Sequence, residues 1–175
     1  MISFQLKSVM QNINKRKIYI LDEKDNKIAD IFKVSYPGKE KGSSFVLRKN
    51  REEIYLGIEK GRLLFATYHV DFNGKTWILK DNMIRSTVYF CVDGEIHDKK
   101  IRFEENWKKE VDVKLDGEKV AIIKPHLYSL EATISMKTEE SRDPLLFAVT
   151  CLMYFMFKIY QDEVEVIESI LDEWI

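Results

Sequence analysis

The most constraining feature of the 175-residue sequence is an uncharged run near its C-terminus, from Leu145 to Phe157. A helix built from this run carries no charge on any face, so every face needs apolar surroundings. The run has 13 residues, whereas spanning a bilayer takes about 20 apolar residues and a run of about 10 to 14 is typical of a buried helix. Lys158 and the polar stretch 139–143 close it on both sides. We therefore expect a helix enclosed by protein rather than by lipid.

The residues on either side of the run indicate where its helix begins and how the chain continues beyond it. Asp143 is a candidate N-cap, and Pro144 suits the first helical position. After Tyr160 the pattern becomes amphipathic, with acidic residues between apolar ones. The apolar residues at helical spacing there are Val164, Ile167, Leu171 and Trp174. We expect a short amphipathic surface helix that caps the sheet or offers its apolar stripe to a partner.

The first 136 residues have a β pattern, because apolar and polar residues alternate with a period of two. Leu130 to Lys137 is the clearest example, and Val111 to Asp116 alternates in the same way. Val88 to Val92 is apolar on both faces and predicts a central strand. Each of these segments fits a strand with at least one face on a core.

Turn signals divide this region into hairpins. Asp22 to Lys27, Asn73-Gly74, Asp93-Gly94 and Asp116-Gly117 are the segments that suit tight turns, because Asn-Gly and Asp-Gly pairs tolerate positive φ angles. Such turns join antiparallel strands. A helix of 13 residues would be about 20 Å long, comparable to the height of a small barrel. We predict a closed antiparallel β-barrel around the C-terminal helix, with strands over about 1–136, helices over about 144–175 and a single domain over 1–175.

Charge and cysteine content limit the class of partner and compartment. The formal net charge is −1, which gives no reason to expect nucleic-acid binding. Residues 1–50 hold 11 basic and 5 acidic residues, so a basic N-terminal third faces either the acidic C-terminal end of the fold or an anionic surface. Cys91 and Cys151 lie in apolar stretches and are expected to be reduced. Residues 1–17 have no apolar segment of signal-peptide length, so we expect a cytoplasmic protein.

The sequence offers no recognisable catalytic constellation. The three histidines are His69, His97 and His126. None of them has another histidine or a cysteine at the spacing that metal ligands need, so no zinc site is expected. The seven glycines do not form a phosphate-binding loop. Adjacent carboxylates such as Glu104-Glu105 and Glu139-Glu140 would point to opposite faces of a strand, and we interpret them as solvated surface. We predict no catalytic residue, no metal ligand and no cofactor.

Two basic clusters remain as candidates for contact with an anion or a lipid headgroup. One is Lys15, Arg16 and Lys17 near the first strand, and the other is Arg48, Lys49 and Arg51 in an expected hairpin loop. Arginine offers a rigid fork of donors and lysine a point charge to phosphate oxygens. The alternative is that both clusters are ordinary solvated surface, since Glu52 and Glu53 dilute the second.

The order of these features resembles the tubby C-terminal-like superfamily, which includes LURP-one-related proteins and phospholipid scramblases. The resemblance rests on Leu21-Asp22 through Phe32, Val113 through Ile123, and Asp143-Pro144-Leu145 through Phe157. It implies a barrel of about twelve strands around a central helix, and in some relatives a phosphoinositide or membrane-surface function. No motif of those relatives places their lipid-binding residues on this chain.

These observations favour a non-enzymatic binding or scaffold domain that contacts a protein partner or anionic lipid headgroups through the barrel exterior. We expect such a domain in the cytoplasm, where peripheral contact with the inner face of the membrane is one of its expected locations. The alternative is a small hydrolase with a pocket at the barrel mouth, around His69 or His126. A barrel filled by Leu145 to Phe157 would leave no space for a substrate inside.

Overall fold

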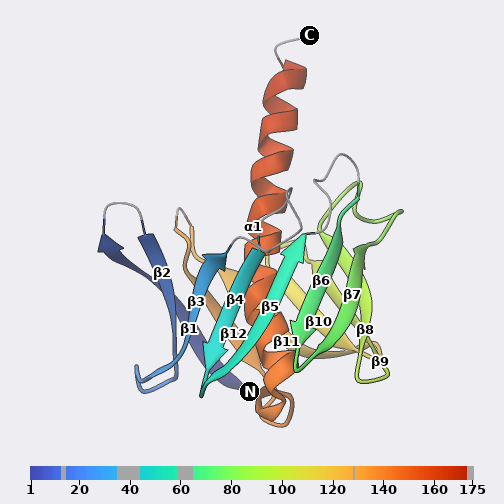
Figure 1. The fold of residues 1–175 in the computed structure, drawn as a ribbon. Helices are drawn as coiled ribbons and strands as arrows, with labels where there is room; N and C mark the ends of the chain where they lie inside the picture. Colours follow the sequence, from blue (N-terminus) through green and yellow to red (C-terminus); the bar gives the residue numbers. More distant parts are fainter. Residues whose placement is uncertain (13–14, 35–43, 59–64, 128, 173–175) are drawn as a thin grey trace.

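The computed structural model describes residues 1–12, 15–34, 44–58, 65–127 and 129–172, with the side chains of all of these except 10–12, 15–16 and 164–172. These ranges contain twelve β-strands, one 3-10 helix and one α-helix (Figure 1). The strands are β1 (Ile2–Asn12), β2 (Lys15–Leu21), β3 (Lys27–Val34), β4 (Ser44–Lys49), β5 (Glu52–Ile58), β6 (Thr67–Phe72), β7 (Lys75–Asp81), β8 (Cys91–Ile96), β9 (Lys99–Glu105), β10 (Val111–Leu115), β11 (Glu118–Pro125) and β12 (Ala132–Met136). The helices are η1 (Glu140–Arg142) and α1 (Pro144–Asp172).

The twelve strands form one closed antiparallel barrel. Each strand pairs with the next along the chain, and β1 pairs with β12 from Ile2↔Met136 to Leu6↔Ala132. Closure leaves none of these strands with an unpaired edge, which removes the usual route to edge-to-edge aggregation. The prediction of a closed barrel of about twelve strands is confirmed.

Helix α1 runs through the barrel. It enters at the end where the N-terminus lies, here called the base, and leaves through the opposite end, here called the mouth (Figure 1). Every residue from Leu145 to Phe157 is at most 5% exposed. Ring contacts tie α1 to the wall near both ends, with centroids 5.0 Å apart for Phe4 and Phe147 and 5.3 Å apart for Phe90 and Phe157. The prediction of a helix enclosed by protein is confirmed.

The helix is also long enough to raise the question of a membrane. By length and composition alone, Pro144–Glu163 would suffice to cross one. In this fold 78% of its most apolar stretch is buried inside the protein. The barrel wall thus supplies the apolar surroundings that a bilayer would otherwise have to supply.

The start of α1 agrees with the sequence, and its continuation does not. The Asp143 Oδ1 atom accepts hydrogen bonds from the backbone N–H groups of Leu145 at 2.9 Å and Leu146 at 3.1 Å, as an N-cap does. The separate helix expected after Tyr160 is wrong, because α1 continues without a break to Asp172. No glycine or proline follows Tyr160, so nothing ends the helix there. The packing of the amphipathic part lies outside the described side chains.

Three of the four predicted turns are confirmed, at 22–26, at Asn73-Gly74 and at Asp116-Gly117. The prediction for Asp93-Gly94 is wrong, since both residues lie within β8. The β8–β9 hairpin turns instead at His97 and Asp98, which have φ angles of 51° and 60°. Gly94 has a different reason to be glycine: a Cβ there would overlap the Leu79 side chain on the neighbouring strand.

The predicted strand over Val88 to Val92 is only partly correct. Strand β8 begins at Cys91, and Val88 is 80% exposed. The backbone N–H of Val88 donates to the carbonyl of Arg85 at 2.9 Å, so this segment is a turn. An apolar residue on the surface of a loop explains why the pattern looked like a strand buried on both faces.

A charge placed in α1 tests the buried position of the helix. Val149 is fully buried, and Val149→Asp would leave an unpaired carboxylate among apolar side chains. We expect the free energy of unfolding to fall by about 3 kcal/mol or more, or folding to fail. Urea denaturation followed by circular dichroism measures this loss. The matched control Val88→Asp makes the same change on the surface and should stay within about 0.5 kcal/mol of the wild type. Equal stability of the two variants would contradict the buried helix.

Candidate functional site at the barrel mouth

The six basic residues predicted as an anion contact do not form one patch in the described side chains. Lys17 on β2 and Arg48 on β4 flank the Phe32 ring on the outer face of the barrel, 6.0 and 4.9 Å from its centre. Both already have carboxylate partners. Lys17 Nζ lies 3.7 Å from Asp30, and Arg48 Nε donates to Glu53 at 2.6 Å. Their charges are therefore largely neutralised on the surface.

The other members of the two clusters point elsewhere or lie outside the described side chains. Lys49 Nζ lies 4.7 Å from the centre of the Phe147 ring on α1, so this side chain turns toward the helix. Arg51 is exposed in the β4–β5 turn, where its φ is 69°. The side chains of Lys15 and Arg16 are not among those described. Contact between these six residues and a headgroup stays a prediction.

An apolar pocket of about 270 Å³ lies at the mouth, between α1 and the wall formed by β2, β3 and β4. The rings of Phe45 on β4 and Phe155 on α1 stack in it with centroids 4.8 Å apart. Its other apolar lining residues include Ile18, Ile31, Leu130 and Ile159. The pocket arises because α1 occupies the barrel axis and leaves a wedge of space where it passes the strand ends.

Two lysines give this mouth pocket a positive character. Lys33 on β3 and Lys158 on α1 line it together with Asp162. In the described part of the chain neither lysine forms an ion pair, and Lys158 Nζ donates only to Gln161 at 3.3 Å. The sequence gives little sign of this pair, because the two lysines are far apart in the chain and each stands alone. The position of Lys158 directly after the uncharged run is the one sequence signal that could have pointed to this site.

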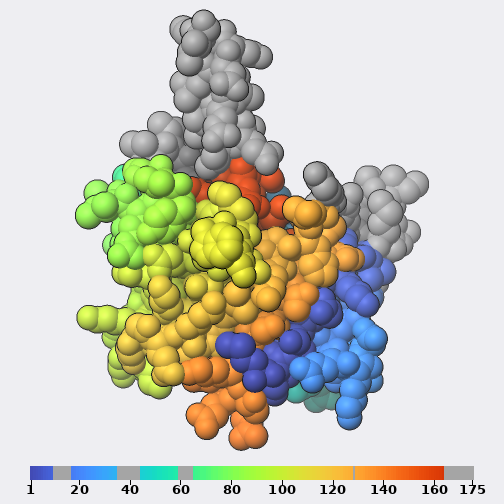
Figure 2. All heavy atoms as spheres, turned by 180° about the vertical axis from the view of Figure 1, so that it is seen from behind, coloured from blue at the N-terminus to red at the C-terminus, as the bar shows by residue number. Residues whose placement is uncertain are grey.

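Loops around the rest of the mouth carry exposed apolar side chains. These are Met83, Ile84, Val88, Trp107 and Leu127, each between 72% and 87% exposed. They belong to the β7–β8, β9–β10 and β11–β12 connections, which lie along the upper edge of the face in Figure 2. Asn82 and Asn106 hold the first two loops, since their Oδ1 atoms accept backbone N–H bonds from Arg85 at 3.0 Å and Lys108 at 2.9 Å. Side-chain hydrogen bonds therefore hold the β7–β8 and β9–β10 loops beside their exposed apolar residues.

The histidines of the alternative hydrolase hypothesis do not line the mouth pocket. His69 lies on β6, paired with Gly57 and Ile78 of the neighbouring strands. His126 lies at the mouth end, with Nε2 3.0 Å from Thr133 Oγ1. The described residues that line the pocket include no histidine. The hydrolase hypothesis stays without a supporting observation at this site.

The adjacent carboxylates Glu104 and Glu105 point to opposite faces of β9, as predicted, but they are not solvated. Glu104 Oε1 accepts hydrogen bonds from Arg85 at 2.6 Å and Tyr89 at 3.1 Å, and its Oε2 accepts one from Lys114 at 2.7 Å. Glu105 is only 9% exposed and accepts the Phe90 backbone N–H at 3.0 Å. The segment before β8 packs against both, which the sequence pattern does not reveal.

The partners of Glu104 change its acidity. Burial by itself would raise the pKa of this carboxyl, but the hydrogen bond and charge of Lys114, the Tyr89 hydroxyl and the charge of Arg85 together lower the pKa below its usual 4.5. Asp93, nearby on β8, behaves in the same way, because bonds from Arg102 and Asn82 outweigh its burial and lower its pKa. This outer face is a balanced ion network that stabilises the wall.

Comparison with protein-family models, with curated proteins and with solved structures finds no match to this chain. The fold itself therefore defines the class of protein. Within the described residues it is a twelve-stranded antiparallel β-barrel that encloses an apolar helix. The resemblance to the tubby C-terminal-like superfamily stays a prediction.

The ion network predicts how stability depends on pH. The folded-state pKa of Glu104 is lowered, so its contribution is present above about pH 4.5 and is lost as the pH falls through the folded value. We expect the free energy of unfolding to decline more steeply below about pH 4.5 in the wild type than in Glu104→Gln. Urea titrations at a series of pH values measure the two slopes. Parallel curves for the two proteins would show that the network does not hold this carboxylate in its charged form.

Proposed function

We propose that the chain is a non-enzymatic binding module that takes up an anionic amphiphile at the barrel mouth. Such a ligand has one apolar chain and a carboxylate or phosphate head. The observation that carries the proposal is the mouth pocket, an apolar space beside α1 that is lined by Lys33 and Lys158, which have no ion-pair partner among the described residues. The resemblance to the tubby C-terminal-like superfamily supports a lipid-like ligand, since some of its members act at membrane surfaces.

The filled interior limits where binding can take place. Leu145 to Phe157 occupy the barrel axis and are buried there, so a ligand has access to the two ends of the barrel and to the outer surface. The mouth pocket of about 270 Å³ is slightly smaller than the roughly 300 Å³ at which pockets for drug-sized ligands begin. It therefore suits a single apolar chain better than a complete lipid.

The two parts of the ligand would be held by different forces. Each methylene buried among Ile31, Phe45 and Phe155 contributes about 0.8 kcal/mol from the hydrophobic effect. A charge-assisted hydrogen bond from a lysine to the head contributes about 1.5–3 kcal/mol. The apolar wall thus gives affinity for the chain, and the lysines select an anionic head over a neutral one.

The same chemistry has two possible sources, a free amphiphile and a bilayer. The acidic continuation of α1 favours the first. From Asp162 to Asp172 the helix extends roughly 15 Å farther, and this part of the sequence holds no basic residue. Its negative charge opposes flat approach to an anionic membrane. The exposed tips Trp107 and Ile84 favour the second source, because such side chains insert readily at a membrane interface.

Binding of decanoate and decyl phosphate tests the proposal. Calorimetry should show saturable binding of both anions and weaker binding of decanol. Lys33→Met and Lys158→Met keep the apolar stems and should each weaken anion binding about tenfold, while decanol binding stays unchanged. The control Lys80→Met removes an exposed lysine of β7 and should have no effect. Absence of saturable binding, or equal losses for decanol, would contradict the proposal.

Vesicle sedimentation separates the two sources. Vesicles of phosphatidylcholine with phosphatidylglycerol should leave the protein in the supernatant if the ligand is a free amphiphile. Salt-sensitive sedimentation that is lost in Trp107→Ala would identify a bilayer surface as the source.

A further inference from the structure

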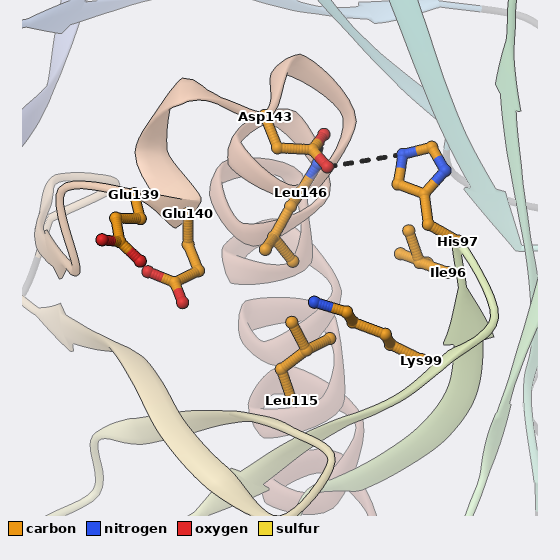
Figure 3. Close-up of a pocket in the computed structure, with 8 residues that line it drawn as sticks. All are labelled: Ile96, His97, Lys99, Leu115, Glu139, Glu140, Asp143 and Leu146. Atoms are coloured by element: carbon orange, nitrogen blue, oxygen red, sulfur yellow. Dashed lines mark hydrogen bonds and ion pairs between the residues drawn. The ribbon is translucent and has the colours of Figure 1, made fainter.

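A second pocket lies at the base of the barrel, at the opposite end from the mouth. Its volume is about 240 Å³, and its residues come from the β8–β9 hairpin, the end of β10, η1 and the first turn of α1 (Figure 3). Ile96, Leu115 and Leu146 form its apolar wall. It shares no lining residue with the mouth pocket, so it is independent of the function proposed above.

Two carboxylates face two basic side chains across this base pocket, and a third carboxylate, that of Asp143, lies beside the His97 ring. Figure 3 shows Glu139 and Glu140 on one side and His97 and Lys99 on the other, with the Lys99 ammonium extending toward the middle. The Glu140 Oε2 atom is buried and accepts no hydrogen bond from the described residues. Lys99 forms no ion pair with any described residue. A carboxylate and an ammonium thus face the same space without being paired to each other.

His97 is held in place by its backbone and its neighbours. It occupies the first central position of the β8–β9 turn with a φ of 51°, a conformation that asparagine and glycine usually supply in such hairpins. Its Nε2 lies 3.4 Å from Asp143 Oδ2, and its ring packs edge-on against Trp77 at 5.9 Å. Asp143 is itself fixed as the N-cap of α1. The contact with Asp143 thus occupies Nε2 of His97, which leaves Lys99 as the lining cation without a carboxylate partner among the described residues.

Two simple classes of ligand fit poorly. A metal ion would meet the Lys99 ammonium, and the described residues include no group of three side chains that could hold one. A small anion would meet the carboxylates of Glu139, Glu140 and Asp143. A ligand with charges of both signs would place each next to its opposite, and the apolar wall would accept an uncharged side chain.

We propose that the base pocket binds a free α-amino acid with an apolar side chain. Its ammonium group would lie between Glu139 and Glu140, its carboxylate would face the Lys99 ammonium, and its side chain would pack on Leu115, Ile96 and Leu146. The small volume favours a single amino acid over a peptide. The sequence does not bring these groups together, because the carboxylates and the cations lie on different elements far apart in the chain.

L-leucine is the probe, and two analogues remove one charge each: 4-methylpentanoate has no ammonium group and 3-methylbutylamine has no carboxylate. In ¹H–¹⁵N NMR titrations of the full chain, leucine should shift the amide signals of His97, Lys99 and Glu140 in a saturable way. Each analogue should bind at least tenfold more weakly. The signals of Leu130 and Ile159 at the mouth should not move.

Variants of the two unpaired groups complete the test. Glu140→Gln and Lys99→Met should each weaken leucine binding at least tenfold, and their urea denaturation should match the wild type because neither side chain has an ion-pair partner among the described residues. The matched controls Glu95→Gln and Lys100→Met change exposed neighbours outside the pocket and should bind leucine normally. Leucine-independent spectra, equal affinity for an analogue, or unchanged binding in both pocket variants would overturn the proposal.

Discussion

The rest of the structure depends on one constraint, which is that the uncharged helix must be shielded from water on all sides. Leu145 to Phe157 present apolar side chains in every direction, so no one-sided contact with a sheet would cover them. A closed barrel covers all sides at once, and β1 closes it by pairing with β12. The dependence is mutual, because the inward side chains of the strands need an apolar filling as much as the helix needs a wall. The two hydroxyl groups of the uncharged run have partners, since the Thr150 hydroxyl donates to the Leu146 carbonyl at 2.8 Å and the Tyr154 hydroxyl donates to the Glu131 carbonyl at 2.9 Å.

One helix takes part in both candidate sites because it passes through the whole barrel. Its first turn contributes Leu146 to the base pocket, where Asp143 caps the helix and contacts His97. Farther along, Phe155 and Lys158 line the mouth pocket. The filled interior thus explains why both pockets are small and why both lie at ends of the barrel. It also places any chemistry of this chain at positions where α1 meets the strand ends and loops.

Patterning of the sequence was sufficient for the barrel and the helix, because both depend on hydrophobic periodicity. It failed where a residue's role depends on a neighbour far away in the chain. Gly94 looked like a turn residue, although it is glycine because Leu79 packs across from it. The true turn at His97 and Asp98 lacks the glycine that usually marks such hairpins. Glu105 looked solvated, although the segment before β8 buries it. Lys33 and Lys158 likewise come to line one pocket, and Lys99 and Glu140 another, only when the barrel brings distant elements together.

The most direct test of the central claim, that α1 is a permanent part of the core, is the rate at which a thiol reagent modifies Cys151. This residue is fully buried at the middle of the apolar run, and burial raises the pKa of its thiol. Cys91 in β8 provides an internal comparison, since burial raises its pKa to about 11. Mass spectrometry of peptides from labelled native protein should show both thiols modified only at the rate of global unfolding, with the same dependence on urea. Rapid modification of Cys151 while Cys91 stays protected would show that the helix leaves an intact barrel, and it would contradict this account.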